Sequence, residues 1–131
     1  NYTARMEKTG RPVSPHVSIY SFPIAALTSI AIRISGMTLS VGAFGVAFLE
    51  LTAGSGSSLE FVQNIANMDS VVVPVLANTA VAFPFVYHYV GGLRHLYWDS
   101  TPEMLTTADV EKASYAVVGG SVILTTASLF V

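Results

Sequence analysis

The 131-residue sequence lacks cysteine and has few charged residues. Without thiolates, the chain can form no disulfide and offers no cysteine ligands for an iron–sulfur cluster or a structural zinc ion. A redox metal bound by its side chains would have to use histidine. The net charge of -2 and the absence of a dense Lys/Arg run argue against a nucleic-acid partner. Only 11% of the residues are charged, against about a quarter in soluble domains.

Apolar residues explain the low charge. Hydrophobic residues make up 52% of the chain, and the mean hydropathy is +0.59. Three stretches can each cross a hydrocarbon core of about 30 Å as a helix: residues 27–51, 71–98 and 113–131. We therefore predict an all-α membrane protein with three transmembrane helices. Residues 1–24 are expected to form an N-terminal segment, and residues 25–131 the membrane domain.

The basic residues predict the orientation. In a three-span topology all six fall on the side of the N-terminus, and the loop 52–70 has none. The positive-inside rule places this side in the cytoplasm or the mitochondrial matrix. The six are Arg5, Lys8, Arg11, Arg33, Arg94 and Lys112.

Shorter patterns predict the connections between the spans. In the first loop a flexible GSGSS stretch precedes residues 59–68, whose apolar positions recur at helical spacing, so we expect a short helix on the membrane surface. Ser100 or Thr101 can cap a turn that begins at Pro102, and Thr107 can cap the third span.

His88 is the first candidate for chemistry. It lies six residues, about 9 Å along a helix, inside Arg94. A neutral imidazole at that depth suits a haem iron ligand, although a histidine hydrogen-bonded to a neighbouring helix has the same pattern. His95 is two turns away and cannot bind the same iron from the opposite side. With His16 outside the spans, a six-coordinate haem would need its second ligand from another chain.

Further polar residues flank this position. Arg94 and His95 lie where haem propionates would emerge, or they act only as a positive-inside anchor. Pro84 leaves the carbonyl of Ala80 without its usual helical partner, which can open space beside His88. Gly91 and Gly92 fit close helix packing.

On the first span, Ser29 and Arg33 are one turn apart and can hydrogen-bond a quinone carbonyl oxygen. The alternative is an arginine that reaches the membrane surface beside a serine bonded to its own helix. Three glycines favour close contact with a partner protein: Gly36, Gly42 and Gly45.

Two longer motifs carry a family resemblance. Residues 11–20 read RPVSPHVSIY and are followed by residues 29–36, SIAIRISG; residues 88–99 read HYVGGLRHLYWD. In these motifs the chain resembles the large cytochrome b anchor subunits of succinate dehydrogenase, respiratory complex II. The resemblance covers residues 11–99, and the third span adds only hydrophobicity.

The resemblance implies roles for particular residues. His88 would be the axial ligand of haem b, with the second ligand from the small cytochrome b anchor subunit. Arg94 and His95 would lie near the haem propionates, and Ser29 and Arg33 in the site for ubiquinone or rhodoquinone. Asp99 would lie near the mouth of that site and help to supply protons. The family's usual histidine before the arginine is Ile32 here, and this loss of a donor leads to the hypothesis of an altered quinone preference.

The resemblance also implies the setting. The chain would hold the flavoprotein and iron–sulfur subunits on the mitochondrial inner membrane, with its N-terminus in the matrix, or on a bacterial inner membrane. We expect no succinate oxidation by the chain alone, and the direction of the complex's reaction stays open. Two other readings stay open: a haem-free structural anchor, and a small proton conductor that uses His88, Arg94 and Asp99 as a relay.

Overall fold

The computed structural model describes residues 1–130, apart from the side chain of His16. Its described part is helical and contains no strand. Three helices are long and apolar enough to cross a membrane, so the prediction of a three-span all-α membrane protein is confirmed. The elements are α1 (Tyr2–Lys8), η1 (His16–Ser18), α2 (Ile24–Ala53), α3 (Ser57–Ala66), α4 (Val72–Ser100), η2 (Pro102–Met104), α5 (Thr107–Ala127) and η3 (Ser128–Phe130).

The first two spans lie where hydropathy predicted them, and the third begins earlier. α5 starts six residues before the predicted position 113 and continues as η3 to Phe130, while Val131 lies outside the described residues. The predicted cap at Thr107 is wrong, because the hydroxyl of Thr106 accepts the N–H of Asp109 at 3.2 Å. The polar first turn of α5 lowers its hydropathy but provides good N-terminal residues, so the helix extends past the apolar stretch.

The loop between α2 and α4 contains the predicted surface helix, α3. It begins within the GSGSS stretch, so the predicted flexible segment is instead ordered by Glu50. The Glu50 carboxylate accepts the N–H of Gly56 at 2.7 Å and the N–H of Ser58 at 2.9 Å, and it also accepts the Ser58 hydroxyl. Glu50 thereby provides acceptors at the N-terminus of α3 that the helix itself lacks. Gly54 and Gly56 make the turn at φ of 101° and 91°.

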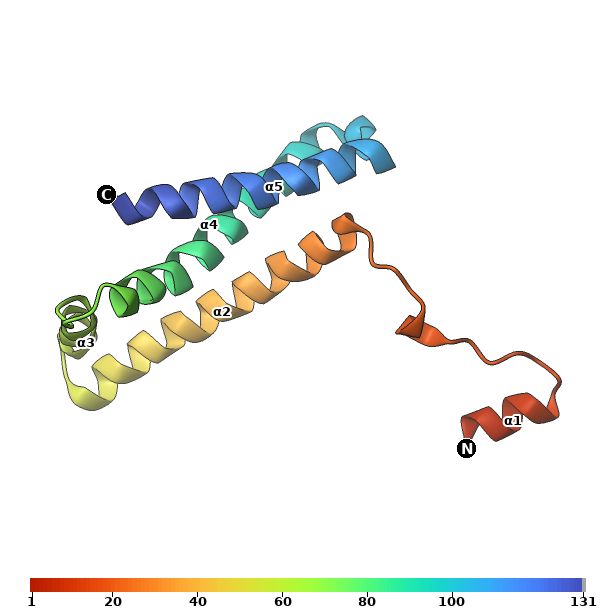
Figure 1. The fold of residues 1–131 in the computed structure, drawn as a ribbon, viewed down its shortest axis with the longest axis horizontal. Helices are drawn as coiled ribbons and strands as arrows, with labels where there is room; N and C mark the ends of the chain where they lie inside the picture. The colour runs from red at the N-terminus through yellow and green to blue at the C-terminus, as the bar shows by residue number, and fades with distance from the viewer. Residues whose placement is uncertain (131) are drawn as a thin grey trace.

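The N-terminal segment extends away from the three long helices (Figure 1). It contains α1 and η1 and reaches α2 through Pro23, which occupies the N-cap position with extended backbone angles. A proline fits this position because the first backbone N–H groups of a helix have no intrahelical acceptor.

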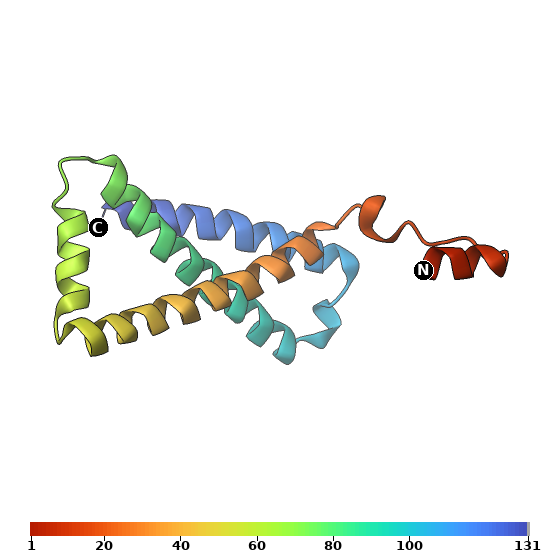
Figure 2. The same ribbon diagram turned by 90° about the horizontal axis from the view of Figure 1, so that it is seen from below.

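The core forms where the three spans meet. Each contributes one buried apolar residue: Ile32 from α2, Tyr87 from α4 and Val117 from α5. α2 crosses α4 at this level, and the two helices diverge toward α3, which connects them (Figure 2). The crossing is close because Gly91 has no side chain. A Cβ built on Gly91 would lie 2.6 Å from Cδ1 of Ile32 and 2.7 Å from its Cγ1.

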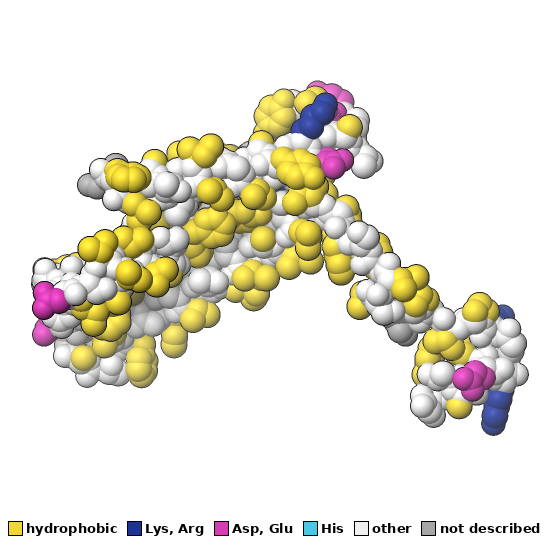
Figure 3. Space-filling view, in the orientation of Figure 1, with side chains coloured by type: hydrophobic (Ala, Val, Ile, Leu, Met, Phe, Trp, Pro, Cys, Tyr) yellow, Lys and Arg dark blue, Asp and Glu magenta, His cyan; other side chains and the backbone are white. Residues whose placement is uncertain are grey.

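The outer surface of the helices is largely apolar. Hydrophobic side chains cover the flank of the helices, and charged side chains gather at their ends and on the N-terminal segment (Figure 3). Many large apolar residues are exposed, among them Phe44, Val41 and Ile123. Burial in lipid or against membrane partners explains this distribution, since water would disfavour it.

Candidate functional site

His88 lies on α4 with its imidazole against α2. Its Nδ1 is 3.0 Å from the carbonyl oxygen of Ile32 and 3.3 Å from the hydroxyl oxygen of Ser35. A carbonyl can only accept a hydrogen bond, so Nδ1 carries the proton in this arrangement. In a neutral imidazole the free electron pair is then on Nε2.

The His88 side chain is exposed on the surface of the three-helix unit. Nε2 has no hydrogen-bond partner within the described part of the chain. Metal-binding histidines usually donate their other ring N–H to a backbone carbonyl or a carboxylate, and His88 has this arrangement toward Ile32. These features fit a haem iron ligand.

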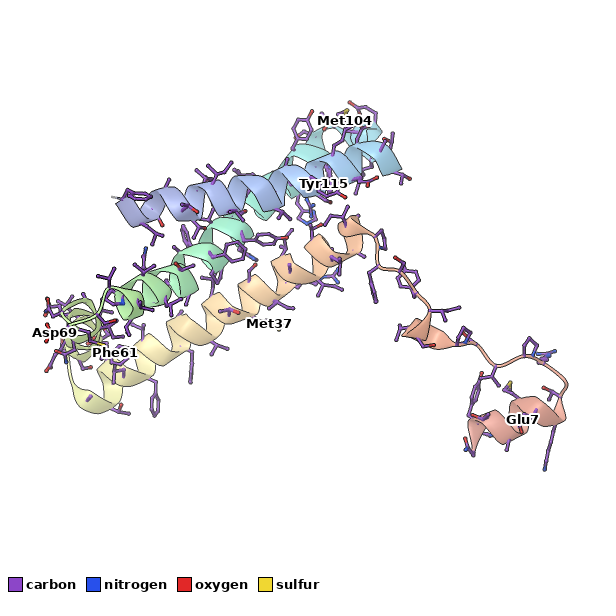
Figure 4. All side chains as sticks on the ribbon, viewed as in Figure 1. Glu7, Met37, Phe61, Asp69, Met104 and Tyr115 are labelled. Carbon is purple, nitrogen blue, oxygen red and sulfur yellow. The ribbon has the colours of Figure 1, made fainter. Side chains whose placement is uncertain are left out.

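Gly36 makes room for the ring. A Cβ at this position would lie 2.7 Å from Cε1 and 3.1 Å from Nδ1 of His88. The prediction that Gly36 contacts a partner protein is therefore replaced by a contact within the chain. Met37, the next residue, points away from the other helices (Figure 4).

The predicted quinone residues lie on the same stripe of α2 as Gly36. Ser29, Arg33 and Gly36 recur at spacings of four and three residues, which places them on one helical face. Ser29 is half-buried and Arg33 is exposed. Arg33 is three residues, about 4.5 Å along the axis, from the glycine that contacts His88. The His88 ring, which comes from α4, therefore lies against α2 within about one turn of Arg33.

Arg94 lies inside the helix junction and is only 8% exposed. Its Nη1 donates to the hydroxyl oxygens of Thr28, at 3.4 Å, and Ser114, at 3.2 Å. These hydroxyls donate in turn to carbonyls of their own helices, Ala25 and Val110. The guanidinium therefore connects α2, α4 and α5.

The charge of Arg94 is not neutralised by a carboxylate in the described part of the chain. Its guanidinium carbon lies 4.6 Å from the centre of the Trp98 ring, which stabilises a cation through its π face. The Nε atom is buried without a hydrogen-bond partner. Contact with a haem propionate stays a prediction for this residue.

Thr28 and Ser114 were not identified from the sequence. Hydroxyl residues in membrane helices usually bond the carbonyl one turn back, so neither residue stands out by its type. One pattern could have indicated the buried face of α5. Ser114, Ser121 and Thr125 recur at seven and four residues, and all three are buried. Tyr115 marks this end of α5 close to the first turns of α2 (Figure 4).

The remaining predicted polar residues lie on the last turns of α4. His95 and Asp99 are both exposed. The ring of His95 meets Trp98 edge to face, with 5.7 Å between the ring centres. His95 is therefore accessible to a partner or cofactor, whereas its neighbour Arg94 is enclosed.

Ile32 lies in the core, 7% exposed. Its side chain fills the space over Gly91 and does not lie on the stripe of Ser29 and Arg33. Packing explains an apolar residue at this position. The hypothesis that it alters quinone preference stays a prediction.

Gly42 and Gly45 differ from the other glycines of the site. A Cβ on either would meet no atom within 4 Å. Both line an apolar cavity of about 570 Å³ between α2, α3 and α4, together with Phe61 and Val81. A second cavity, of about 320 Å³, lies beside Gly42 and Pro84, so there is open space one turn from His88.

Known proteins match most of this chain, including the residues described above. The family described as "Succinate dehydrogenase/Fumarate reductase transmembrane subunit" matches residues 7–128. The cytochrome b560 subunit of succinate dehydrogenase from Dictyostelium discoideum is 34% identical over 122 residues, 92% of this chain and 62% of that protein. The Bos taurus b560 subunit is 36% identical over 113 residues, 82% of this chain and 63% of that protein.

The cytochrome b556 subunit from Paracoccus denitrificans is 32% identical over 131 residues, 98% of this chain and 96% of that protein. The chain therefore spans about three fifths of the length of the two mitochondrial relatives and nearly all of the bacterial one.

Proposed function

Because the chain belongs to the succinate dehydrogenase/fumarate reductase transmembrane subunit family, we propose that it is a membrane anchor subunit of respiratory complex II. In this role it binds haem b through His88 and forms part of the site where quinone exchanges electrons with the complex. The observation that carries the proposal is the exposed imidazole of His88, whose Nδ1–H is held by the Ile32 carbonyl and whose Nε2 is free.

In this proposal, His88 and the residues around it contact different parts of haem b. Nε2 of His88 would bind the iron, and the small anchor subunit would supply the other ligand. His95 is exposed on the same side of α4 as His88, two turns nearer the basic end, and donates to a propionate. Arg94 adds positive charge from within the helix junction. When bound, haem b supplies a one-electron carrier.

Arg33 and Ser29 bind the quinone. A guanidinium on an exposed helix face can donate to a carbonyl oxygen, and its charge stabilises the negative charge that develops there on reduction. The Ser29 hydroxyl, one turn away, orients the ring. Asp99 lies near the mouth of the site and helps protons to arrive. Ubiquinone and rhodoquinone both offer the carbonyl oxygens that this pair recognises.

The proposal includes the surroundings of the chain. The flavoprotein and iron–sulfur subunits bind at the basic end, where the N-terminal segment and the α4–α5 connection lie. By the positive-inside rule this end faces the mitochondrial matrix in the inner membrane, or the cytoplasm in a bacterium. The apolar surface between the two ends contacts lipid and the small anchor subunit.

The haem assignment is tested in the purified, assembled complex. We expect a haem b spectrum in the unmodified complex and its loss in His88→Ala. Tyr89→Ala is the matched control, because Tyr89 is the next residue on α4 and is exposed. A haem-free structural anchor shows no such band in any form, and an unchanged spectrum in His88→Ala contradicts the assignment.

The quinone assignment is tested with Arg33→Leu. We expect loss of quinone reduction, while electrons from succinate still reach a water-soluble artificial acceptor. Loss of both activities indicates failed assembly. Retention of quinone reduction contradicts the role of Arg33. Proton flux by this chain alone in liposomes would instead favour the proton-conductor reading.

A further inference from the structure

The imidazole of His88 rests in a seat on α2 formed by the Ile32 carbonyl, the Ser35 hydroxyl and the bare Cα of Gly36. We infer that Ser35 and Gly36 are positioning residues, which hold His88 in the ring orientation and the tautomer that an iron ligand needs. The inference rests on the proposed function, because it concerns how the proposed ligand is held.

Gly36 fixes the position of the ring through its missing side chain. A Cβ there would lie 2.7 Å from Cε1, 3.1 Å from Nδ1 and 3.6 Å from Nε2 of His88. Real Cβ atoms almost never approach another atom to under 3.0 Å. A methyl group at this position therefore moves the imidazole away from α2. The hydrogen bond from Nδ1 to the Ile32 carbonyl oxygen then becomes longer.

Ser35 provides a second hydrogen-bond acceptor for His88. It is 6% exposed, and its hydroxyl donates to the Ile32 carbonyl at 2.6 Å. Because its proton is used there, the Ser35 oxygen faces Nδ1 of His88, at 3.3 Å, as an acceptor. Two acceptors thus surround Nδ1, which keeps the proton on Nδ1 and the electron pair on Nε2.

The seat has a consequence for the iron. Acceptors that hold the Nδ1–H make the other ring nitrogen a stronger electron donor. A stronger donor favours the ferric state and lowers the midpoint potential of the haem. Ser35 and Gly36 therefore act on the potential and on the ligand geometry without touching the cofactor.

This arrangement brings two separate stretches of the sequence into contact. Ser35 and Gly36 end the stretch 29–36, and His88 begins the stretch 88–99. Ser35 and His88 are 53 positions apart in the chain. The end of one motif forms the seat of the residue that opens the other.

The test uses the assembled complex and two pairs of variants. Gly36→Ala is paired with Gly45→Ala, which adds the same methyl to the same helix with no atom within 4 Å. Ser35→Ala is paired with Ser40→Ala. Among the described residues, the Ser40 hydroxyl bonds only the Gly36 carbonyl of its own helix, at 2.9 Å. The readouts are the electron paramagnetic resonance signal of the ferric haem and its midpoint potential.

We expect Gly36→Ala to shift the low-spin signal or convert it to a high-spin one, and Ser35→Ala to shift the midpoint potential to a more positive value. Both controls keep the signal and potential of the unmodified complex. Ser35→Ala removes atoms and creates no clash, so it decides the question if Gly36→Ala fails to accumulate.

Unchanged signal and potential in Ser35→Ala and in any Gly36→Ala complex that accumulates overturn the inference. The His88→Ala complex separates this outcome from a failure of the proposed function. If that complex keeps its haem signal, the ligand assignment itself is wrong. If it loses the signal while the seat variants are unchanged, His88 is the ligand and only the seat is wrong.

Discussion

The two halves of the helix assembly are built differently. At the basic end the three spans meet closely around Ile32, Tyr87 and Val117, with Arg94 bonded to hydroxyls of both neighbouring helices. Toward α3, α2 and α4 diverge, and Gly42 and Gly45 border open cavities. Along α2, the close half contains the residues with proposed roles at the quinone and haem sites, Ser29, Arg33 and Gly36.

This difference indicates where the chain positions side chains by itself. In the close half, a neighbouring side chain fills the space that a Cβ on Gly36 or Gly91 would take. The absence of a side chain at these two positions therefore determines where His88 and Ile32 lie. In the open half, a methyl on Gly42 or Gly45 changes nothing within the chain. Glycine is thus required at Gly36 and Gly91 and is only a tolerated choice at Gly42 and Gly45.

The largest effect is expected for Gly91→Ala in the close half. The new methyl lies 2.6 Å from Cδ1 of Ile32, so α2 and α4 must separate or Ile32 must leave its preferred rotamer. Overpacking of this kind destabilises a protein by about 1–3 kcal/mol. A lower midpoint of thermal unfolding in the purified complex is the measurement.

Gly92→Ala is the control, because it adds a methyl one residue away with no atom within 4 Å. Ile32→Val in the Gly91→Ala background should recover part of the loss, since it shortens the side chain that clashes. Equal stability of the two alanine variants would show that α2 and α4 do not pack against each other at Gly91 as closely as described.

The next effect concerns the hydroxyls around Arg94. Ser114→Ala removes an acceptor of a buried cation, which should destabilise the protein by about 1–3 kcal/mol. Ser121→Ala is matched in helix, residue type and burial, but the Ser121 hydroxyl has no hydrogen-bond partner among the described residues, so we expect no loss of stability or a gain. Thermal unfolding of both variants is the measurement, and a larger loss in Ser121→Ala would contradict the assigned role of Ser114.

These comparisons also show what the sequence could predict. Hydropathy located the three spans, because lipid selects apolar residues over a fixed length. The start of α5 was missed because Asp109, Glu111 and Lys112 lower the hydropathy of a turn that is still helical. Polar side chains are rare within the apolar segments, and this identified the candidate residues His88, Arg33 and Ser29.

The residues that contact Arg94 and His88 could not be predicted in the same way. Thr28 and Ser114 are 86 positions apart, and only the crossing of the helices brings them to Arg94. Gly36 was expected to contact another protein, because spacing along one helix does not reveal which neighbour occupies the gap. Contacts between helices depend on crossing angle and register, which a local pattern does not contain.

A smaller effect is expected in the open half for Glu50→Gln. The amide keeps one acceptor oxygen but loses the charge that favours the N-terminus of α3. By analogy with helix caps, the loss of stability is smaller than that of Gly91→Ala and is confined to α3. Faster hydrogen exchange of α3 amides is the measurement, with Glu103→Gln, which lies outside α3, as the control.

The smallest effect is expected for Gly45→Ala. Its Cβ enters open space, and alanine favours a helix over glycine by about 1 kcal/mol. Thermal unfolding should show no loss and a slight gain. A loss as large as that of Gly91→Ala would mean that the open half is as tightly packed in the complex as the close half.

The central claim is that this chain supplies one haem ligand, the Nε2 of His88, held outward from α2. The most direct measurement is electron nuclear double resonance on the ferric haem of a complex in which only this chain carries ¹⁵N-labelled histidine. The chain has three histidines, and the account predicts one strongly coupled ¹⁵N ligand, which disappears in His88→Ala. No coupled ¹⁵N, or two axial ¹⁵N ligands from this chain, would contradict it.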